Sequence, residues 1–266
     1  MTEATRRTPG TPCWVSLMVH GLDEIQMFYG ELFGWEFSPG PGQLGPYVRG
    51  LLDGKEVAGI GRLPADRQLP IAWTPYLWTD DADATAELVR CSGGTVGVGP
   101  LDAADAGRMA IVTDPAGAVF GLWQPASHHG ISLHGTHGTP VWHELLTSTT
   151  SSVSKFYETV FGYEIEKDTP AEPEAGSPQG EENDRVTLLL DGRAVAALHG
   201  VGRTLSRRRG TAWMTYFQVE DTDRSASQVI ELGGQVITPP SDGPHGRTAT
   251  VSDPEGAVFT LVRQRS

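Results

Sequence analysis

The hydrophobic and polar positions of the chain follow first a strand-like and then a helix-like period. Residues 14–19 are rich in β-forming side chains, whereas residues 23–33 carry apolar side chains at helical spacing and end at Gly34. Two further apolar segments, 47–52 and 57–60, flank the turn-forming sequence Asp-Gly-Lys and predict a hairpin. The chain is therefore expected to begin with a strand, a helix and then more strands.

The same order starts again at residues 73–79, which form the next predicted strand. A helix is predicted at 81–92 because the apolar period ends at a Gly-Gly pair. Two strands then flank "DPAG" at 114–117, where proline presets the turn and glycine closes it. The first half thus predicts two units of strand, helix and three strands, written βαβββ.

The second half repeats these landmarks in the same order, which shows an internal duplication. Trp14 corresponds to Trp142, and the paired segments are 27–37 with 155–165, 72–83 with 212–223, and 107–122 with 246–261. The predicted organisation is a flexible N-terminus (1–10), a first module (11–125), a Gly/His linker (126–138) and a second module (139–266). Residues 168–184 are an acidic, proline-rich insertion in the second module, expected to be a solvated loop, with a lid as the alternative.

Composition narrows the class of partner. The chain has 266 residues and a formal net charge of −13, which disfavours nucleic acid as a partner. No apolar run approaches the roughly 20 residues that cross a bilayer, and the N-terminal residues lack the apolar stretch of a secretory signal, so the cytoplasm is the expected location. The architecture allows either a monomer or a homodimer.

Four βαβββ units, the "FYxxxFGW/Y" end of the first helix and the "DPxGxVF" hairpin resemble the vicinal oxygen chelate superfamily of glyoxalases, bleomycin-resistance proteins and extradiol dioxygenases. The resemblance covers Gly10 to Arg263 and is strongest to the tandem actinobacterial branch labelled glyoxalase- or hydroxylase-like. It implies an α+β fold in which paired units form half-open barrel pockets. Metal-dependent members hold an ion there with His and Glu side chains.

The positions that the resemblance assigns to metal ligands carry unsuitable residues in both modules. They fall at Trp14, Thr74 and Gly121, and at Trp142, Met214 and Thr260. Indole is only a hydrogen-bond donor and thioether is a poor ligand for the divalent ions concerned. We therefore expect no metal and no other cofactor.

Strand alternation sends every second side chain to the same face, so the ligand positions also define the predicted pocket wall. A planar, largely apolar aromatic molecule of the polyketide type is the predicted ligand, because aromatic rings recognise flat molecules by stacking. The alternative is that the rings only fill the barrel. The predicted ligand-binding residues are Trp14, Ser16, Met18, Thr74, Tyr76, Trp78, Gly121, Trp123, Trp142, Met214, Gln218 and His245.

The second module carries the candidate chemistry. Glu144 shares the inner face with Trp142, and desolvation beside indole is expected to raise its pKa towards the range of a general acid or base. His199 and Tyr216 are the other predicted catalytic residues. His143 alternates to the opposite face, where a capping or surface role is expected. The four linker histidines are expected to be solvated.

Three functions remain open at this point. The favoured one is a metal-free enzyme of secondary metabolism that cyclises, dehydrates or epimerises its substrate, or forms a ketal. The second is a binding protein that sequesters a drug or metabolite, as bleomycin-resistance relatives do. The third is a metal enzyme that uses His143, Glu144, His199 and His245.

Overall fold

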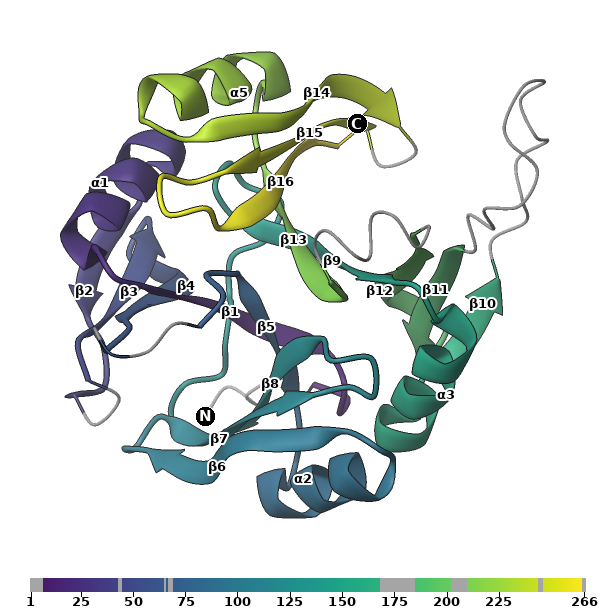
Figure 1. The fold of residues 1–266 in the computed structure, drawn as a ribbon. Coiled ribbons are helices and arrows are strands. Elements are labelled where there is room, and N and C mark those ends of the chain that lie inside the picture. Colours follow the sequence, from purple (N-terminus) through teal and green to yellow (C-terminus); the bar gives the residue numbers. More distant parts are fainter. Residues whose placement is uncertain are drawn as a thin grey trace, which may run out of the picture.

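The computed structural model consists of two open, twisted eight-stranded sheets, one from each half of the chain (Figure 1). It describes residues 7–42, 45–64, 66, 69–167, 185–201, 210–243 and 246–264. The strand order is β2-β3-β4-β1-β5-β8-β7-β6 in the first sheet and β10-β11-β12-β9-β13-β16-β15-β14 in the second. The identical order confirms the predicted α+β fold of two tandem modules, each built from two βαβββ units.

In the first module, each helix separates one strand from the three that follow it. The elements are β1 (Pro12–Val19), α1 (Leu22–Phe33), β2 (Glu36–Pro39), β3 (Tyr47–Leu52), β4 (Lys55–Arg62), β5 (Thr74–Trp78), α2 (Ala82–Cys91), β6 (Thr95–Ala103), β7 (Gly107–Thr113) and β8 (Val119–Pro125).

The second module repeats this succession. Its elements are β9 (Pro140–Thr147), α3 (Thr150–Phe161), β10 (Glu164–Lys167), β11 (Arg185–Leu190), β12 (Arg193–Gly200), β13 (Ala212–Gln218), α5 (Thr222–Glu231), β14 (Gln235–Gly243), β15 (Gly246–Ser252) and β16 (Val258–Arg263). None of the helices in the described part of the chain is long and apolar enough to cross a bilayer.

The helix ends follow local sequence signals. Asp81 caps α2 because its carboxylate accepts a 2.9 Å hydrogen bond from the Ala84 amide. Asp221 caps α5 in the same way. Gly34 and Gly162 end α1 and α3 in the left-handed conformation that glycine adopts at little cost. The repeated "FG" of the helix motif is therefore a stop signal.

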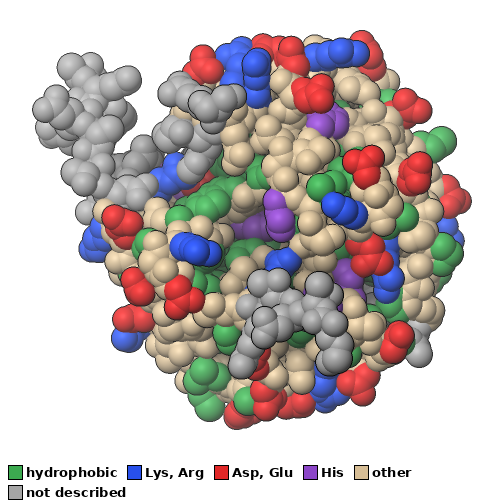
Figure 2. Space-filling view, turned by 180° about the vertical axis from the view of Figure 1, so that it is seen from behind, with side chains coloured by type: hydrophobic (Ala, Val, Ile, Leu, Met, Phe, Trp, Pro, Cys, Tyr) green, Lys and Arg blue, Asp and Glu red, His purple; other side chains and the backbone are tan. Residues whose placement is uncertain are grey.

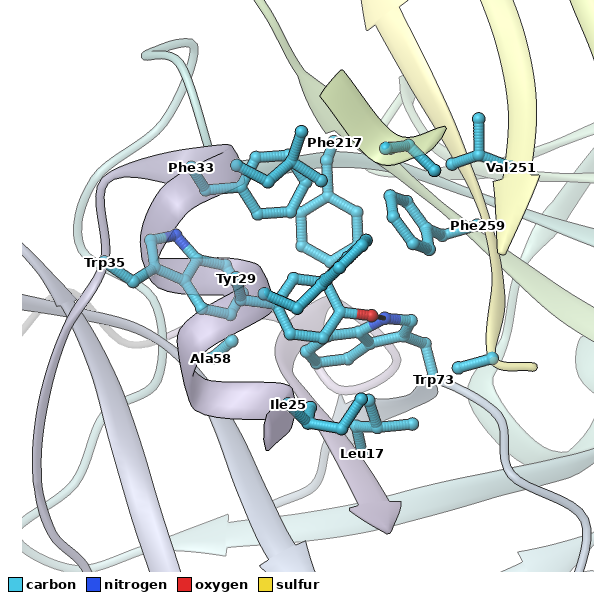
Figure 3. Close-up of a cluster of buried hydrophobic side chains, with 14 of the residues drawn as sticks. Leu17, Ile25, Tyr29, Phe33, Trp35, Ala58, Trp73, Phe217, Val251 and Phe259 are labelled. Carbon is cyan, nitrogen blue, oxygen red and sulfur yellow. Dashed lines mark hydrogen bonds between the residues drawn. The ribbon is translucent and has the colours of Figure 1, made fainter. Parts of the chain in front are cut away.

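The hydrophobic cores lie between units of different modules. One cluster joins β1, β4 and α1 of the first module to β13, β15, β16 and α5 of the second. Figure 3 shows Tyr29, Phe33 and Trp73 packed against Phe217 and Phe259, with Phe33 and Phe217 stacked at 5.0 Å between ring centroids. The other cluster joins the second unit of the first module to the first unit of the second module. The modules therefore share their cores and form one body.

Two hydrogen-bonded triads cross this shared core. The Trp73 indole donates to the Tyr29 hydroxyl at 2.9 Å, and that hydroxyl donates to Asp253 of the other module at 3.1 Å. In the symmetrical triad Trp213 donates to Tyr157, whose hydroxyl donates to Asp114. The "FY" and "DPxG" motifs that mark the fold thus meet across the module boundary.

The outer surface carries interspersed acidic and basic side chains (Figure 2). On the face shown in Figure 2 the molecule is hollowed, and hydrophobic and histidine side chains gather in the hollow. The predicted acidic insertion, residues 168–184, and His245 lie outside the described residues.

Candidate functional site

The inner face of each sheet carries the residues that alternation predicts. In β1, Val15, Leu17 and Val19 belong to the core beneath the helices. Trp14 lines a small cavity on the opposite face, together with Tyr76 and Trp123. The side chains of β9 alternate in the same way, so Trp142, Glu144 and Leu146 share the inner face of the second sheet.

Strand register defines a row that contains two of the three positions in each module that the resemblance assigns to metal ligands. Trp14 lies opposite Tyr76, which lies beside Gly121. In the second module Trp142 lies opposite Tyr216, which lies beside Thr260. A tyrosine therefore stands at the centre of each row, and the predicted positions Thr74 and Met214 lie two residues away, opposite Ser16 and Glu144.

Glu144 is the centre of a polar cluster on the inner face of the second module. Its side chain is buried, with only 3% of the residue exposed. One carboxylate oxygen, Oε2, accepts a 2.5 Å hydrogen bond from the Tyr216 hydroxyl. The other, Oε1, lies 3.1 Å from Nη2 of Arg185 and 3.7 Å from Nδ1 of His199. The three predicted catalytic residues are therefore brought together.

Tyr216 remains protonated in this cluster. Burial raises its pKa well above the ordinary tyrosine value, and the neighbouring Glu144 carboxylate raises it further. The Arg185 guanidinium and then the Thr260 hydroxyl act in the opposite direction and lower the Tyr216 pKa. Tyr216 is thus fixed as a donor to Glu144, with Thr260 on its other side.

Arg185 was not among the residues predicted from the sequence. It begins β11 and pairs in register with His199 across the hairpin, which brings its guanidinium to Glu144. Counting back from the Asp191-Gly192 turn would have placed Arg185 opposite Leu198, because a β-bulge between Leu188 and Leu189 shifts the register by one residue and brings Arg185 opposite His199. The surroundings of Glu144 are therefore more polar than the indole and leucine that were expected.

The first module has lost this chemistry at the equivalent positions. Ser16 stands for Glu144, Tyr47 for Arg185 and Gly61 for His199, as the shared register of the two sheets shows. Ser16 donates a 3.2 Å hydrogen bond to the Tyr76 hydroxyl, a neutral counterpart of the Tyr216–Glu144 pair. Among the described residues, the second module has a carboxylate at this position, whereas the first module has a different ion pair, Arg49 with Glu56, with Arg49 two strands away from Ser16.

The aromatic wall of the first module is packed. Its rings are about 5–8% exposed and form a hydrophobic cluster, Trp14, Tyr76, Trp78 and Trp123 among them. The cavity that remains has a volume of about 40 Å³, room for a few water molecules. The rings pack mainly against one another in this structure, which favours the barrel-filling alternative for the first module.

The space beside Gly121, one of the predicted ligand-binding residues, is occupied by a side chain of the protein itself. A Cβ atom at Gly121 would lie 2.1 Å from Cδ1 of Tyr76. The missing side chain therefore accommodates the Tyr76 ring. At Gly59 a Cβ would likewise meet the Tyr47 hydroxyl.

The linker closes the first module from outside. The His128 ring lies edge-on to Trp14 with 4.5 Å between centroids, and its Nδ1 is 2.7 Å from Oε2 of Glu56. The Trp123 indole donates to the His128 carbonyl at 2.9 Å. Burial lowers the His128 pKa, whereas Glu56 acts to raise it. The expectation of solvated linker histidines is wrong for His128, although His129 is exposed.

The inner face of the second module keeps more exposed surface. Trp142, Tyr216 and Gln218 are partly exposed, and the side chains of Arg185 and His199 are 22% and 33% exposed. Met214 is buried at 8% and lies opposite Glu144. In the first module, the predicted residues Met18 and Thr74 are partly exposed on the corresponding strands. The polar cluster can therefore be approached from outside.

His143 lies on the opposite face, as predicted, but it is buried and not at the surface. Its Nδ1 lies 3.3 Å from the Thr215 hydroxyl, and burial lowers its pKa to about 4. His143 therefore cannot join Glu144 and His199 on the inner face. The alternative metal set of His143, Glu144, His199 and His245 has one member on the wrong face and one outside the described residues.

The residues present do not fit the metal of the superfamily. The three ligand positions carry Trp142, Tyr216 or Met214, and Thr260, and none of these side chains is a good neutral or anionic ligand for a divalent ion. Across the described ranges, no group of three His, Cys, Asp or Glu side chains could hold an ion. Glu144 and His199 form only a pair.

Comparison with known proteins agrees with this architecture. The glyoxalase-like domain family matches residues 145–262. The chain is 37% identical over 268 residues to "Putative glyoxylase CFP32" of Mycobacterium tuberculosis, covering 99% of this chain and 98% of that protein. It is 34% identical over 276 residues to "Anthracycline biosynthesis protein DnrV" of Streptomyces peucetius, with 98% and 96% covered.

Solved structures share the fold at low identity. The Mn(II)-bound glyoxalase from Novosphingobium aromaticivorans superposes with a TM-score of 0.62 at 17% identity, covering 98% of this chain and 86% of that chain. The 2,2',3-trihydroxybiphenyl 1,2-dioxygenase of Sphingomonas wittichii strain RW1 gives 0.61 at 16% identity, covering 96% and 90%. The chain belongs to the vicinal oxygen chelate superfamily, among its two-module glyoxalase-like members.

Proposed function

We propose that the second module binds a planar aromatic small molecule of the polyketide type and performs acid–base chemistry on it without a metal. Similarity to DnrV, whose name places it in anthracycline biosynthesis, supports this class of ligand. An anthracycline-like ring system would lie against the inner face, where Trp142 and Leu146 offer apolar surface beside the polar cluster. Stacking on an aromatic ring adds about 0.5–1.5 kcal/mol beyond burial.

One observation carries the proposal. Glu144 is a buried carboxylate that contacts a tyrosine, an arginine and a histidine on one face, while the duplicated first module has Ser16 and uncharged partners at the same positions. The sheet itself does not require these four groups, because the first module forms it without them and has a different ion pair, Arg49 with Glu56, near its cavity. Positioned acid–base groups contribute about 10²–10⁴-fold to rates.

The groups around Glu144, which are a tyrosine, an arginine and a histidine, are suited to a proton-transfer reaction. Epimerisation and aldol-type cyclisation both begin with loss of a proton next to a carbonyl, and a polyketide supplies such acidic positions. Arg185, 3.1 Å from Glu144, would stabilise the negative charge as it moves between protein and ligand. Dehydration and ketal formation remain within the same class of chemistry. The protein would act as a monomer or a homodimer.

Binding is tested by titrating the protein with anthraquinones and anthracyclines while tryptophan fluorescence is followed. Trp142→Phe should weaken binding at least about fivefold, because a phenyl ring offers a smaller stacking surface than indole and lacks its N–H donor. Trp14→Phe, at the same position of the closed first module, should leave affinity within about twofold. Loss of binding in Trp14→Phe alone would move the site to the first module.

Catalysis is separated from sequestration by Glu144→Gln. An enzyme should lose turnover by about 100-fold or more while its affinity changes little. A protein that only sequesters its ligand should show no turnover in the wild type, and only its affinity should respond to the substitution.

A further inference from the structure

A general base that acts directly must contact its ligand, but the Glu144 carboxylate is buried and hydrogen-bonded to the Tyr216 hydroxyl. Glu144 is 3% exposed, and its Oε1 atom is fully buried at the Arg185 side. Tyr216 is partly exposed, and its hydroxyl covers Oε2. A ligand on the inner face can therefore exchange a proton with Oε2 only through the Tyr216 hydroxyl or by displacing it.

We propose that Tyr216 is the residue that exchanges a proton with the ligand, and that Glu144 receives that proton only through the Tyr216 hydroxyl. This inference rests on the proposed function and names its proton path. It also names the substrate class, which is an aromatic molecule with an acidic C–H or O–H group beside a carbonyl. Arg185 and Thr260 then act as positioning residues.

The relay balances as two coupled transfers. The ligand's C–H or O–H bond breaks, and its proton bonds to the Tyr216 oxygen while the electron pair stays on the ligand. The original Tyr216 O–H bond breaks, and that proton bonds to Glu144 Oε2. Tyr216 is neutral before and after, which agrees with the energetic cost of a buried phenolate. In total, one negative charge moves from Glu144 to the ligand. Arg185 lies beside the Glu144 carboxylate, from which that charge departs.

Thr260 sets the geometry of the relay. The register places Thr260 beside Tyr216 on β13 and β16, and its hydroxyl acts to lower the Tyr216 pKa. A phenol oxygen has two lone pairs, so it can accept from Thr260 and from the ligand while it donates to Glu144. The first module has Gly121 at this position, and its Tyr76 accepts from Ser16 instead.

The test follows deuterium incorporation into the acetyl group of 2-acetylanthraquinone in D₂O by mass spectrometry, beside a fluorescence titration with the same probe. Tyr216→Phe and Glu144→Gln should each slow exchange by about 100-fold, with affinity within about threefold. Thr260→Val should slow exchange about fivefold, the effect of one hydrogen bond. Tyr47→Phe, which removes a hydroxyl packed in the first module, should leave exchange unchanged.

The outcomes separate this inference from the proposed function. Exchange by Tyr216→Phe within about threefold of the wild type, with Glu144→Gln inactive, would show that Glu144 acts directly and would overturn the relay alone. A wild-type protein that binds the probe and exchanges nothing would overturn the proposed function itself. Melting temperatures and probe affinities exclude misfolding as the cause of a loss, and Thr260→Val tests the relay with both acid–base groups in place.

Discussion

Ser16 and Glu144 occupy the same strand position in the two modules, and each is hydrogen-bonded to the tyrosine on the neighbouring strand. In the first module the pair is neutral, and the packed aromatic rings around it leave a cavity of about 40 Å³. In the second module the pair is charged, and Arg185 approaches the carboxylate. Duplication followed by divergence has left one module as a packed partner and the other with a polar, accessible face.

This relationship predicts coupling between Glu144 and Arg185. Glu144→Ser alone should destabilise the protein by about 1–2 kcal/mol, because it leaves the guanidinium of Arg185, 22% exposed, without its carboxylate. The double variant Glu144→Ser/Arg185→Tyr copies Ser16 and Tyr47 of the first module and should recover part of that loss. Urea unfolding of the two single variants and the double variant measures the coupling; additive effects would show that the pair contributes nothing to stability.

His143 predicts a loss of stability in acid. Its folded-state pKa of about 4 lies below the ordinary value of 6.5, so its contribution is complete above about pH 6.5 and is lost as the pH falls towards 4. The pKa difference corresponds to about 3 kcal/mol. His143→Val, which copies Val15 of the first module, should therefore be less sensitive to acid than the wild type.

The His143 measurement is a comparison of urea unfolding at pH 7.5 and 4.5. Asp253 acts in the opposite direction: burial raises its pKa to about 6, so its contribution is present below about pH 4 and is lost as the pH rises through 6. Both proteins contain Asp253, so its effect cancels when the pH dependence of stability of His143→Val is subtracted from that of the wild type. Parallel pH profiles for the two proteins would contradict the assignment to His143.

The two triads across the shared core predict similar losses of stability when either central tyrosine loses its hydroxyl. Tyr29→Phe removes the hydroxyl that joins the Trp73 indole to the Asp253 carboxyl, and Tyr157→Phe removes its symmetrical counterpart between Trp213 and Asp114. Each should cost about 2–3 kcal/mol, since a buried donor and a buried carboxyl both lose a partner. Calorimetry should show a single transition in both variants, because the modules share their cores. Two separate transitions would mean that the modules unfold independently.

The contacts of the linker predict that His128→Ala lowers stability through the first module and leaves ligand affinity unchanged. His128→Ala should lower stability by about 1–3 kcal/mol through loss of contacts with Trp14 and Glu56. His129→Ala, at the exposed neighbouring position, should change stability by less than about 0.5 kcal/mol. Anthraquinone affinity should stay unchanged in both, since the proposed site is in the second module. A rise in the number of bound ligands for His128→Ala would instead show that the linker masks a second site.

Much of the fold follows from the sequence, because its signals are local and occur twice. The glycine stops, the Asp caps and the "DPxG" turns each act within a few residues, and the duplication supplied an independent check on every element. The cross-module triads do not follow in this way. Nothing near Tyr29 in the sequence indicates that Asp253 is its partner, because that contact depends on how the units pair in space.

The candidate site was predictable where strand alternation decides it. Trp142, Glu144 and Tyr216 lie on the expected face, and the hairpin brings His199 to them. Arg185 was missed because its approach depends on register across the hairpin. The sequence left open whether the rings of the first module form a ligand slot or fill the barrel, because the linker that closes this module has no periodic signal. Glycine composition alone does not reveal that Gly121 makes room for a ring.

The central claim is that the second module performs acid–base chemistry without a metal. The direct measurement is deuterium incorporation into 2-acetylanthraquinone by protein dialysed against a chelator, with the metal content of the same sample determined by elemental analysis. We predict exchange at the undialysed rate with far less than one ion per chain, and a loss of about 100-fold in Glu144→Gln. Exchange that disappears on chelation and returns with a divalent ion would contradict the account.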